Sequence, residues 1–240
     1  MNGNIRQMLD RWCEALKTGK TCRISASGRQ GVISPDGVLM LASHGLLAAA
    51  FDIASDIGPL HPEAKRRFLK VWIRHGHSIR HTLQEDTLLF DALWQLLPPY
   101  AGTEPLQLYR GQPWGRRPED TTYIGASWTD DFALARRYAM FGTETLKSPG
   151  KARDAQIEAR RTRGEPTVIQ ATIAPDQIIC AVQDHGKTRL FSDREFIVDP
   201  RRLRPDDLSM ITTDELDAIQ PQLQNGKQAL ARRMLAAPED

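Results

Sequence analysis

The sequence has few cysteines, no long apolar run and almost no net charge. Its three cysteines, Cys13, Cys22 and Cys180, are odd in number and far apart. Such a set does not form a disulfide framework, which favours reduced thiols in a cytoplasmic protein. The 32 Lys and Arg residues against 30 Asp and Glu leave a formal charge of +2. No global field therefore points to nucleic acid or a membrane, and any charged binding surface must be local.

Signals for secretion and membrane insertion are also missing. The first residues lack the basic-then-apolar order of a secretory signal. The apolar run that starts at Gly45 stops at Asp52, well short of the roughly 18 residues that a membrane span needs. We therefore expect a soluble cytoplasmic protein without a membrane partner. A protein delivered into a host cell without a cleaved signal peptide would have the same sequence features.

Hydrophobic periodicity divides the chain into a helical first part and a β-rich second part. Apolar residues at three- and four-residue spacing predict helices over about 4–18, 44–57, 62–83 and 85–97. Short alternating runs between turn signals predict a hairpin or a three-stranded meander over 22–25, 32–34 and 38–41. We expect an α+β protein with a mostly helical region that contains a small β-hairpin, residues 1–103, followed by a second domain, residues 104–240.

Strand-like runs dominate that second domain. They cover residues 106–109, 122–128, 167–173, 177–182, 188–191 and 195–198. A helix with Phe132 and Tyr138 on its inner face follows the second run, and Thr129 or Asp130 is the expected cap. The tail from about Thr213 has a helical, polar pattern.

Two motif fragments do not complete a site. Thr18-Gly19-Lys20-Thr21 is like the end of a phosphate-binding loop, but the upstream glycine is absent, so we interpret it as a helix end. His75, His77 and His81 are spaced by two and then four residues, which does not bring all three to one helix face. No cysteine or carboxylate completes a ligand set, and we expect no metal site.

Three polar groups stand at predicted strand ends in the second domain. They are Arg110 in Tyr109-Arg110-Gly111, the hydroxyls of Ser127-Trp128-Thr129, and the carboxylates of Asp193-Arg194-Glu195. Strand alternation puts Asp193 and Glu195 on one face. Each group also has a structural explanation, namely a salt-bridged strand end, a helix cap and a solvated strand start.

The order of these three groups along the chain, and their placement on predicted strands, resemble the pattern of the Arg-Ser-Glu class of mono-ADP-ribosyltransferases. This is the cholera-toxin-like class. That family has an arginine on its first core strand and a Ser-x-Ser or Ser-x-Thr triplet on the second. A later strand begins with a glutamate two residues after a Glu or Gln. The resemblance covers roughly Leu106 to Pro200 and implies a split β-sandwich with flanking helices.

The resemblance also implies roles for the residues, with NAD as the substrate and no metal. Arg110 would bind the pyrophosphate of NAD through its guanidinium fork, and Gly111 would let the backbone approach the cofactor. Glu195 would stabilise the oxocarbenium-like transition state as the nicotinamide bond breaks. Ser127 would position Glu195, with Thr129 behind it. The aromatic rings that could pack on nicotinamide are Tyr138, Phe141 and Phe191.

Asp193 is the departure from the family pattern, because its stem is one methylene shorter than that of the usual Glu. The acceptor is therefore open: a macromolecule, with protein favoured over nucleic acid, or water in an NAD glycohydrolase. A third alternative is a catalytically inactive binding module that uses the basic stretch 147–163. That stretch holds six basic and two acidic residues, a local +4, but no aromatic residue for base stacking. A toxin or effector role follows from the resemblance alone.

Overall fold

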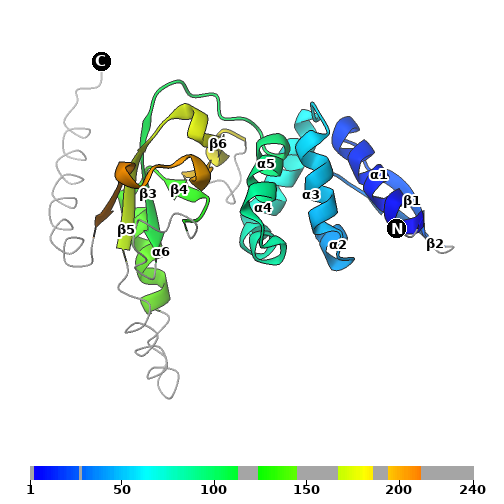
Figure 1. The fold of residues 1–240 in the computed structure, drawn as a ribbon, viewed down its shortest axis with the longest axis horizontal. Coiled ribbons are helices and arrows are strands. Elements are labelled where there is room, and N and C mark those ends of the chain that lie inside the picture. Colours follow the sequence, from blue (N-terminus) through cyan, green and yellow to red (C-terminus); the bar gives the residue numbers. More distant parts are fainter. Residues whose placement is uncertain (1–2, 27–28, 113–123, 145–166, 186–193, 212–240) are drawn as a thin grey trace, which may run out of the picture. The chain divides into compact units, whose positions relative to one another are not determined.

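The computed structural model describes residues 3–26, 29–112, 124–144, 167–185 and 194–211 (Figure 1). Contacts within the chain group these residues into two compact units. The first unit combines residues 1–103 with 178–199, and the second combines residues 104–177 with 200–240. An α+β architecture with an antiparallel sheet is confirmed, and we describe each unit by itself.

The N-terminal part of the first unit, up to residue 96, consists of five helices and a hairpin (Figure 1). The elements are α1 Gly3–Thr18, β1 Cys22–Ala26, β2 Arg29–Ile33, α2 Val38–Ser43, α3 Leu47–Asp56, α4 Pro62–Leu83 and α5 Asp86–Leu96. The expected helices over 4–18, 62–83 and 85–97 are confirmed to within two residues, and α3 begins three residues later than expected. β1 and β2 pair in antiparallel register from Cys22 opposite Ile33.

The prediction of a third strand at residues 38–41 is wrong, because residues 38–43 form the helix α2. The Gly37 carbonyl accepts hydrogen bonds from the backbone N–H groups of Met40 and Leu41 at 3.0 and 3.2 Å, which closes a helical turn. Val38 and Leu41, three residues apart, are both fully buried. A four-residue apolar run fits a strand and a helical turn equally well, and packing decided between them.

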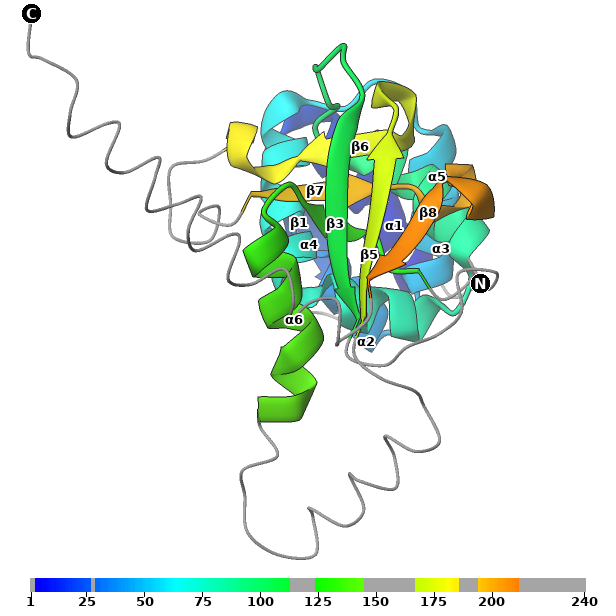
Figure 2. The ribbon, with the colours of Figure 1, turned by 90° about the vertical axis from the view of Figure 1, so that its left-hand side faces the viewer.

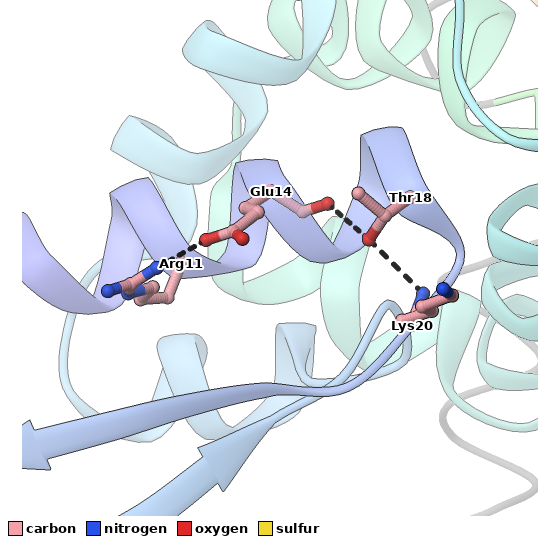
Figure 3. A network of polar contacts seen from close by, with 4 residues as sticks. All are labelled: Arg11, Glu14, Thr18 and Lys20. Atoms are coloured by element: carbon pink, nitrogen blue, oxygen red, sulfur yellow. Dashed lines mark hydrogen bonds and ion pairs between the residues drawn. The ribbon is translucent and has the colours of Figure 1, made fainter.

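The end of α1 confirms that Thr18 to Thr21 is a helix end. Gly19 has a left-handed φ of +70°, a conformation that favours glycine and commonly terminates a helix. The Thr18 hydroxyl donates to the Glu14 carbonyl at 2.8 Å and accepts from the Lys20 N–H at 3.4 Å (Figure 3). The Glu14 carboxylate meets Arg11 at 2.5 Å on the same helix.

Helix α4 is the longest element of the unit and has defined ends. His61 precedes it and accepts the Glu63 N–H at its Nδ1, 3.1 Å away, while Pro62 occupies the first turn. Gln84 ends the helix in a left-handed conformation with φ 53°. Buried residues line one face of the helix: Ala64, Phe68, Leu69, Trp72, Gly76 and Ile79.

Strands β6 (Ile178–Ala181) and β7 (Glu195–Val198) also belong to the first unit and pair in antiparallel register. The Tyr100 N–H donates to the Ile179 carbonyl at 2.9 Å. Just after β7, the Trp94 indole N–H donates to the carboxylate of Asp199 at 3.0 Å, and Asp199 is fully buried. These contacts join the strand pair to α5 and to the segment that follows it.

The second unit is built on four antiparallel strands in the order β4-β3-β5-β8. Strands β3, β5 and β8 of this order lie side by side in Figure 2. They are β3 Leu106–Gln112, β4 Ser127–Thr129, β5 Thr167–Ile173 and β8 Leu208–Ile211. Helix α6, Phe132–Glu144, packs against β3. Short 3-10 helices follow β5, β6 and β7 at Pro175–Gln177, Val182–His185 and Pro200–Arg202, and another precedes β8 at Pro205–Asp207.

The predicted strands of the second half are confirmed in part. β5 and β7 have the expected bounds, and β6 is shorter by one residue at each end. β3 continues to Gln112, so Arg110 and Gly111 lie within it, whereas β4 starts only at Ser127. β8 was not predicted. The expected strand 188–191 and the helical tail from Thr213 lie outside the described residues.

In the part of the chain that the structure describes, no helix is long and apolar enough to cross a membrane.

Candidate functional site

The arginine and the Ser-x-Thr triplet lie on neighbouring strands of the second unit. Tyr109 of β3 is opposite Thr129 of β4. From the next position of β3, the Arg110 guanidinium donates through Nη1 to the carbonyl of Ser127 at 2.5 Å. The structure therefore brings together two of the three groups that the sequence singled out.

Gly125 explains how the arginine comes to lie there. A Cβ added at Gly125 would be 2.0 Å from Nη2 and 2.4 Å from Cζ of Arg110. The absence of a side chain at this position thus leaves room for the guanidinium. The indole of the buried Trp128 fixes the same turn, because its N–H donates to the Gly125 carbonyl at 3.2 Å.

The hydroxyl of Thr129 acts locally. Thr129 is buried, and its Oγ1 accepts the backbone N–H of Asp131 at 3.1 Å. The expected cap at Thr129 or Asp130 is wrong, because Asp131 caps α6: its carboxylate accepts the N–H groups of Ala133 and Leu134 at 2.8 and 3.2 Å. Asp131 is the cap because it directly precedes the first helical residue, where its carboxylate reaches the N–H groups of Ala133 and Leu134, which have no acceptor within the helix.

Gly111 has a packing reason for its lack of a side chain. A Cβ at this position would meet the carbonyl oxygen of Ala135 at 2.0 Å and the backbone nitrogen of Ala139 at 2.5 Å. The backbone of β3 therefore contacts the backbone of α6 directly. This packing explains the glycine without a cofactor, and the approach of a cofactor to Gly111 stays a prediction.

Of the three candidate aromatic residues, Tyr138 has a described side chain. It lies on α6 and is 50% exposed, so the expectation that it lies on the inner face of this helix is wrong. Phe141 falls within α6, but its side chain is outside the described part, as is the whole of Phe191. Among other rings of the unit, Tyr109 and Phe132 pack edge to face with centroids 5.4 Å apart.

Glu195 is the first residue of β7 and is half-buried, whereas Asp193 lies outside the described residues. Three apolar residues follow Glu195 in the strand, Phe196, Ile197 and Val198, and all are buried. Glu195 thus stands between the exposed Arg194 and three buried residues, and its shared strand face with Asp193 stays a prediction. It belongs to the first compact unit, and Arg110 and Ser127 belong to the second.

The strand beside β7 carries a buried thiol in the field of Glu195. Burial raises the pKa of Cys180 to about 12, and the carboxylates of Asp184 and Glu195 add to the rise, while Lys65 opposes it. Burial also lowers the pKa of Lys65. The Cys180 thiol is therefore protonated at neutral pH, which excludes it as a thiolate nucleophile. Its assignment to the core is confirmed.

Sequence reasoning missed three residues that shape these sites. Gly125 makes room for Arg110, Asp131 caps α6, and Asp199 anchors the end of β7 through Trp94. Asp131 had a usable signal, because it directly precedes the first apolar residue of the helix. Nothing local identifies the partners of Gly125 or Asp199.

Metal binding and relatives add no further candidates. Among the residues with described positions, no group of three or more His, Cys, Asp or Glu side chains could hold a metal ion. No protein-family model, curated protein or solved structure matches the chain.

Proposed function

We propose that this protein is an NAD-dependent mono-ADP-ribosyltransferase that transfers ADP-ribose to a macromolecular acceptor. The observation that carries the proposal is the hydrogen bond from Arg110 to the Ser127 carbonyl. This hydrogen bond joins β3, which carries Arg110, to Ser127, the first residue of the Ser-x-Thr triplet on β4.

The chemistry assigns one task to each group. Arg110 meets an NAD phosphate with charge-assisted hydrogen bonds from its guanidinium fork. The bond between nicotinamide and C1′ of ribose breaks, and its electron pair leaves with the nicotinamide. Positive charge then develops on the ribose, and the carboxylate of Glu195 stabilises that charge. The acceptor nucleophile bonds to C1′ and loses its proton.

Two further observations are compatible with this proposal. Tyr138 presents a half-exposed ring on the helix that follows the triplet, which suits packing on the flat nicotinamide. The Gly111 contact holds β3 against α6, and the Asp131 carboxylate caps the start of α6. A rigid support of this kind preserves the position of binding groups.

The test is incubation of the purified protein with NAD labelled in its adenylate part, together with a cell extract as acceptor. Covalent label on macromolecules supports the transferase. Free ADP-ribose without macromolecular label supports the NAD glycohydrolase instead. Absence of both products, with the chain still binding NAD or the extract, supports the inactive binding module.

The decisive variant is Glu195→Gln, which removes the charge and keeps the volume. We expect nicotinamide release to fall at least about a hundredfold, because the lost group acts on charge that develops in the transition state. NAD affinity should change only a few-fold. Glu104→Gln is the matched control, since Glu104 is exposed between the two regions of the chain, and it should be fully active. Unchanged turnover in the Glu195 variant would exclude the assigned role.

A further inference from the structure

Helix α4 has a cationic face that no part of the proposed transferase chemistry uses. Its exposed members are Arg66, Lys70, Arg74, His77 and His81, which we call the α4 basic stripe. Their spacing of four, four, three and four residues places them within an arc of about 80° and along about 22 Å of the helix. The buried residues of α4 lie on the opposite side. The stripe is thus a straight row of donors on a rigid support.

The charge of the stripe is largely uncompensated. Glu63 is the one acidic residue of α4, and it pairs with Arg66 at 3.1 Å, where both side chains are about half exposed. Such an exposed pair contributes little and yields readily to a competing anion. Among the residues that the structure describes, neither Lys70 nor Arg74 forms an ion pair.

Other basic residues of α4 behave differently. Arg67 pairs with Asp36 at 2.6 Å, and Arg80 pairs with Asp86 at 2.5 Å. Both arginines are less exposed than Arg66 and have partners on other segments of the unit. Arg67 and Arg80 thus have acidic partners outside the helix, whereas the stripe has one exposed pair, at Arg66, and no ion pair at Lys70 or Arg74 among the described residues.

The composition of the stripe selects among anionic partners. Interfaces with folded proteins have an apolar or aromatic centre, and the stripe has none. Insertion into a membrane surface needs the apolar face of the helix, which is buried in the unit. Single-stranded nucleic acid is held by stacking on aromatic rings, which the stripe also lacks. The phosphates of a duplex require only a row of cationic donors.

We propose that the α4 basic stripe binds the phosphate backbone of double-stranded nucleic acid, without reading its sequence. Arg66, Lys70 and Arg74 supply the charges, and the imidazoles of His77 and His81 extend the row as N–H donors. The proposal is independent of the transferase reaction, because it concerns binding that needs no NAD.

The number of charges sets the expected salt dependence. Three phosphate contacts give a slope of about −2.7 for the logarithm of the binding constant against the logarithm of the salt concentration. Affinity should then fall about 40-fold between 50 and 200 mM salt. With Lys70 and Arg74 reversed to Glu, a single contact remains, and the same change of salt should cost only about three- to fourfold.

The experiment is fluorescence anisotropy of a labelled 20-base-pair duplex titrated with the full chain without NAD. Lys70→Glu/Arg74→Glu should weaken binding at least tenfold at 50 mM salt, and Lys70→Gln/Arg74→Gln should lie between it and the original protein. The matched control is Lys20→Glu/Arg23→Glu, which changes net charge equally at two exposed positions near β1. It should bind within about threefold of the original protein. Circular dichroism checks that every variant is folded.

Several results would overturn the proposal. One is failure of the original protein to bind the duplex at 50 mM salt. Another is an equal loss of affinity in the Lys20 and Arg23 control, which would show a response to net charge alone. Displacement of the duplex by polyglutamate at equal charge concentration would assign the stripe to acidic proteins. Tighter binding to phosphatidylserine vesicles than to the duplex would assign it to anionic membranes.

Discussion

Replacing Gly111 by alanine should separate the packing role of this residue from its proposed role beside NAD. The strand β3 and the helix α6 meet backbone to backbone at this position. An added Cβ would lie 2.0 Å from the Ala135 carbonyl oxygen and 2.5 Å from the Ala139 nitrogen. Both atoms belong to a helix backbone, so no side-chain rotation relieves the contact. The helix and the strand must move apart by more than 1 Å for an ordinary contact distance.

The magnitude follows from two opposing effects. Alanine in a strand is favoured over glycine by about 0.5–1 kcal/mol, because glycine loses more conformational freedom on folding. Forcing a methyl group into a packed contact costs about 1–3 kcal/mol and occasionally more. A rigid backbone neighbour puts Gly111 at the upper end of that range, so we expect a net loss of about 2–2.5 kcal/mol. For a chain of this size the midpoint of thermal unfolding should fall by roughly 4–10 °C.

The assay is thermal and urea unfolding followed by circular dichroism, with Gly125→Ala as the comparison. The contact at Gly125 is with the guanidinium of Arg110, which is the far end of a flexible side chain and can move. Gly125→Ala should therefore change the unfolding midpoint less than Gly111→Ala, while weakening NAD binding more. A Gly111→Ala protein as stable as the original would refute the close contact between β3 and α6.

Two other changes have defined outcomes. Asp131→Ala should cost about 0.5–2 kcal/mol of unfolding free energy, because two N–H groups at the start of α6 lose their acceptor; Asp131→Asn should recover most of the loss in urea unfolding, and no loss in either variant would argue against the cap. A thiol reagent at pH 8 should label the partly exposed Cys22 and spare the buried Cys180 until the chain unfolds. Because the pKa of Cys180 is raised to about 12, the unfolded chain releases this proton first, so unfolding free energy should decrease as pH rises from about 9 towards 12. Cys180→Ala should lose that decrease, and rapid labelling of Cys180 in the folded protein would contradict its burial.

Elements with long or complete local patterns could be predicted from the sequence. Helix α4 repeats its apolar residues over six turns, and Pro62 marks its start, so local sequence signals were enough to place it. Strand β5 likewise has enough apolar and β-branched residues to be identified over its full length. Residues 38–43 carry a run too short to distinguish a strand from a helical turn, and only burial of Val38 and Leu41 decided it.

For the candidate site, the sequence by itself determined the residue types and their order along the chain: Arg110, then Ser127 and Thr129, then Glu195. Side-chain chemistry and alternation within a strand are local properties, so these assignments needed no contacts. The tertiary structure decided which groups touch. It directs Arg110 to the Ser127 carbonyl and fills the space over Gly111 with α6. These contacts join segments many residues apart, and no local pattern encodes the distance between them.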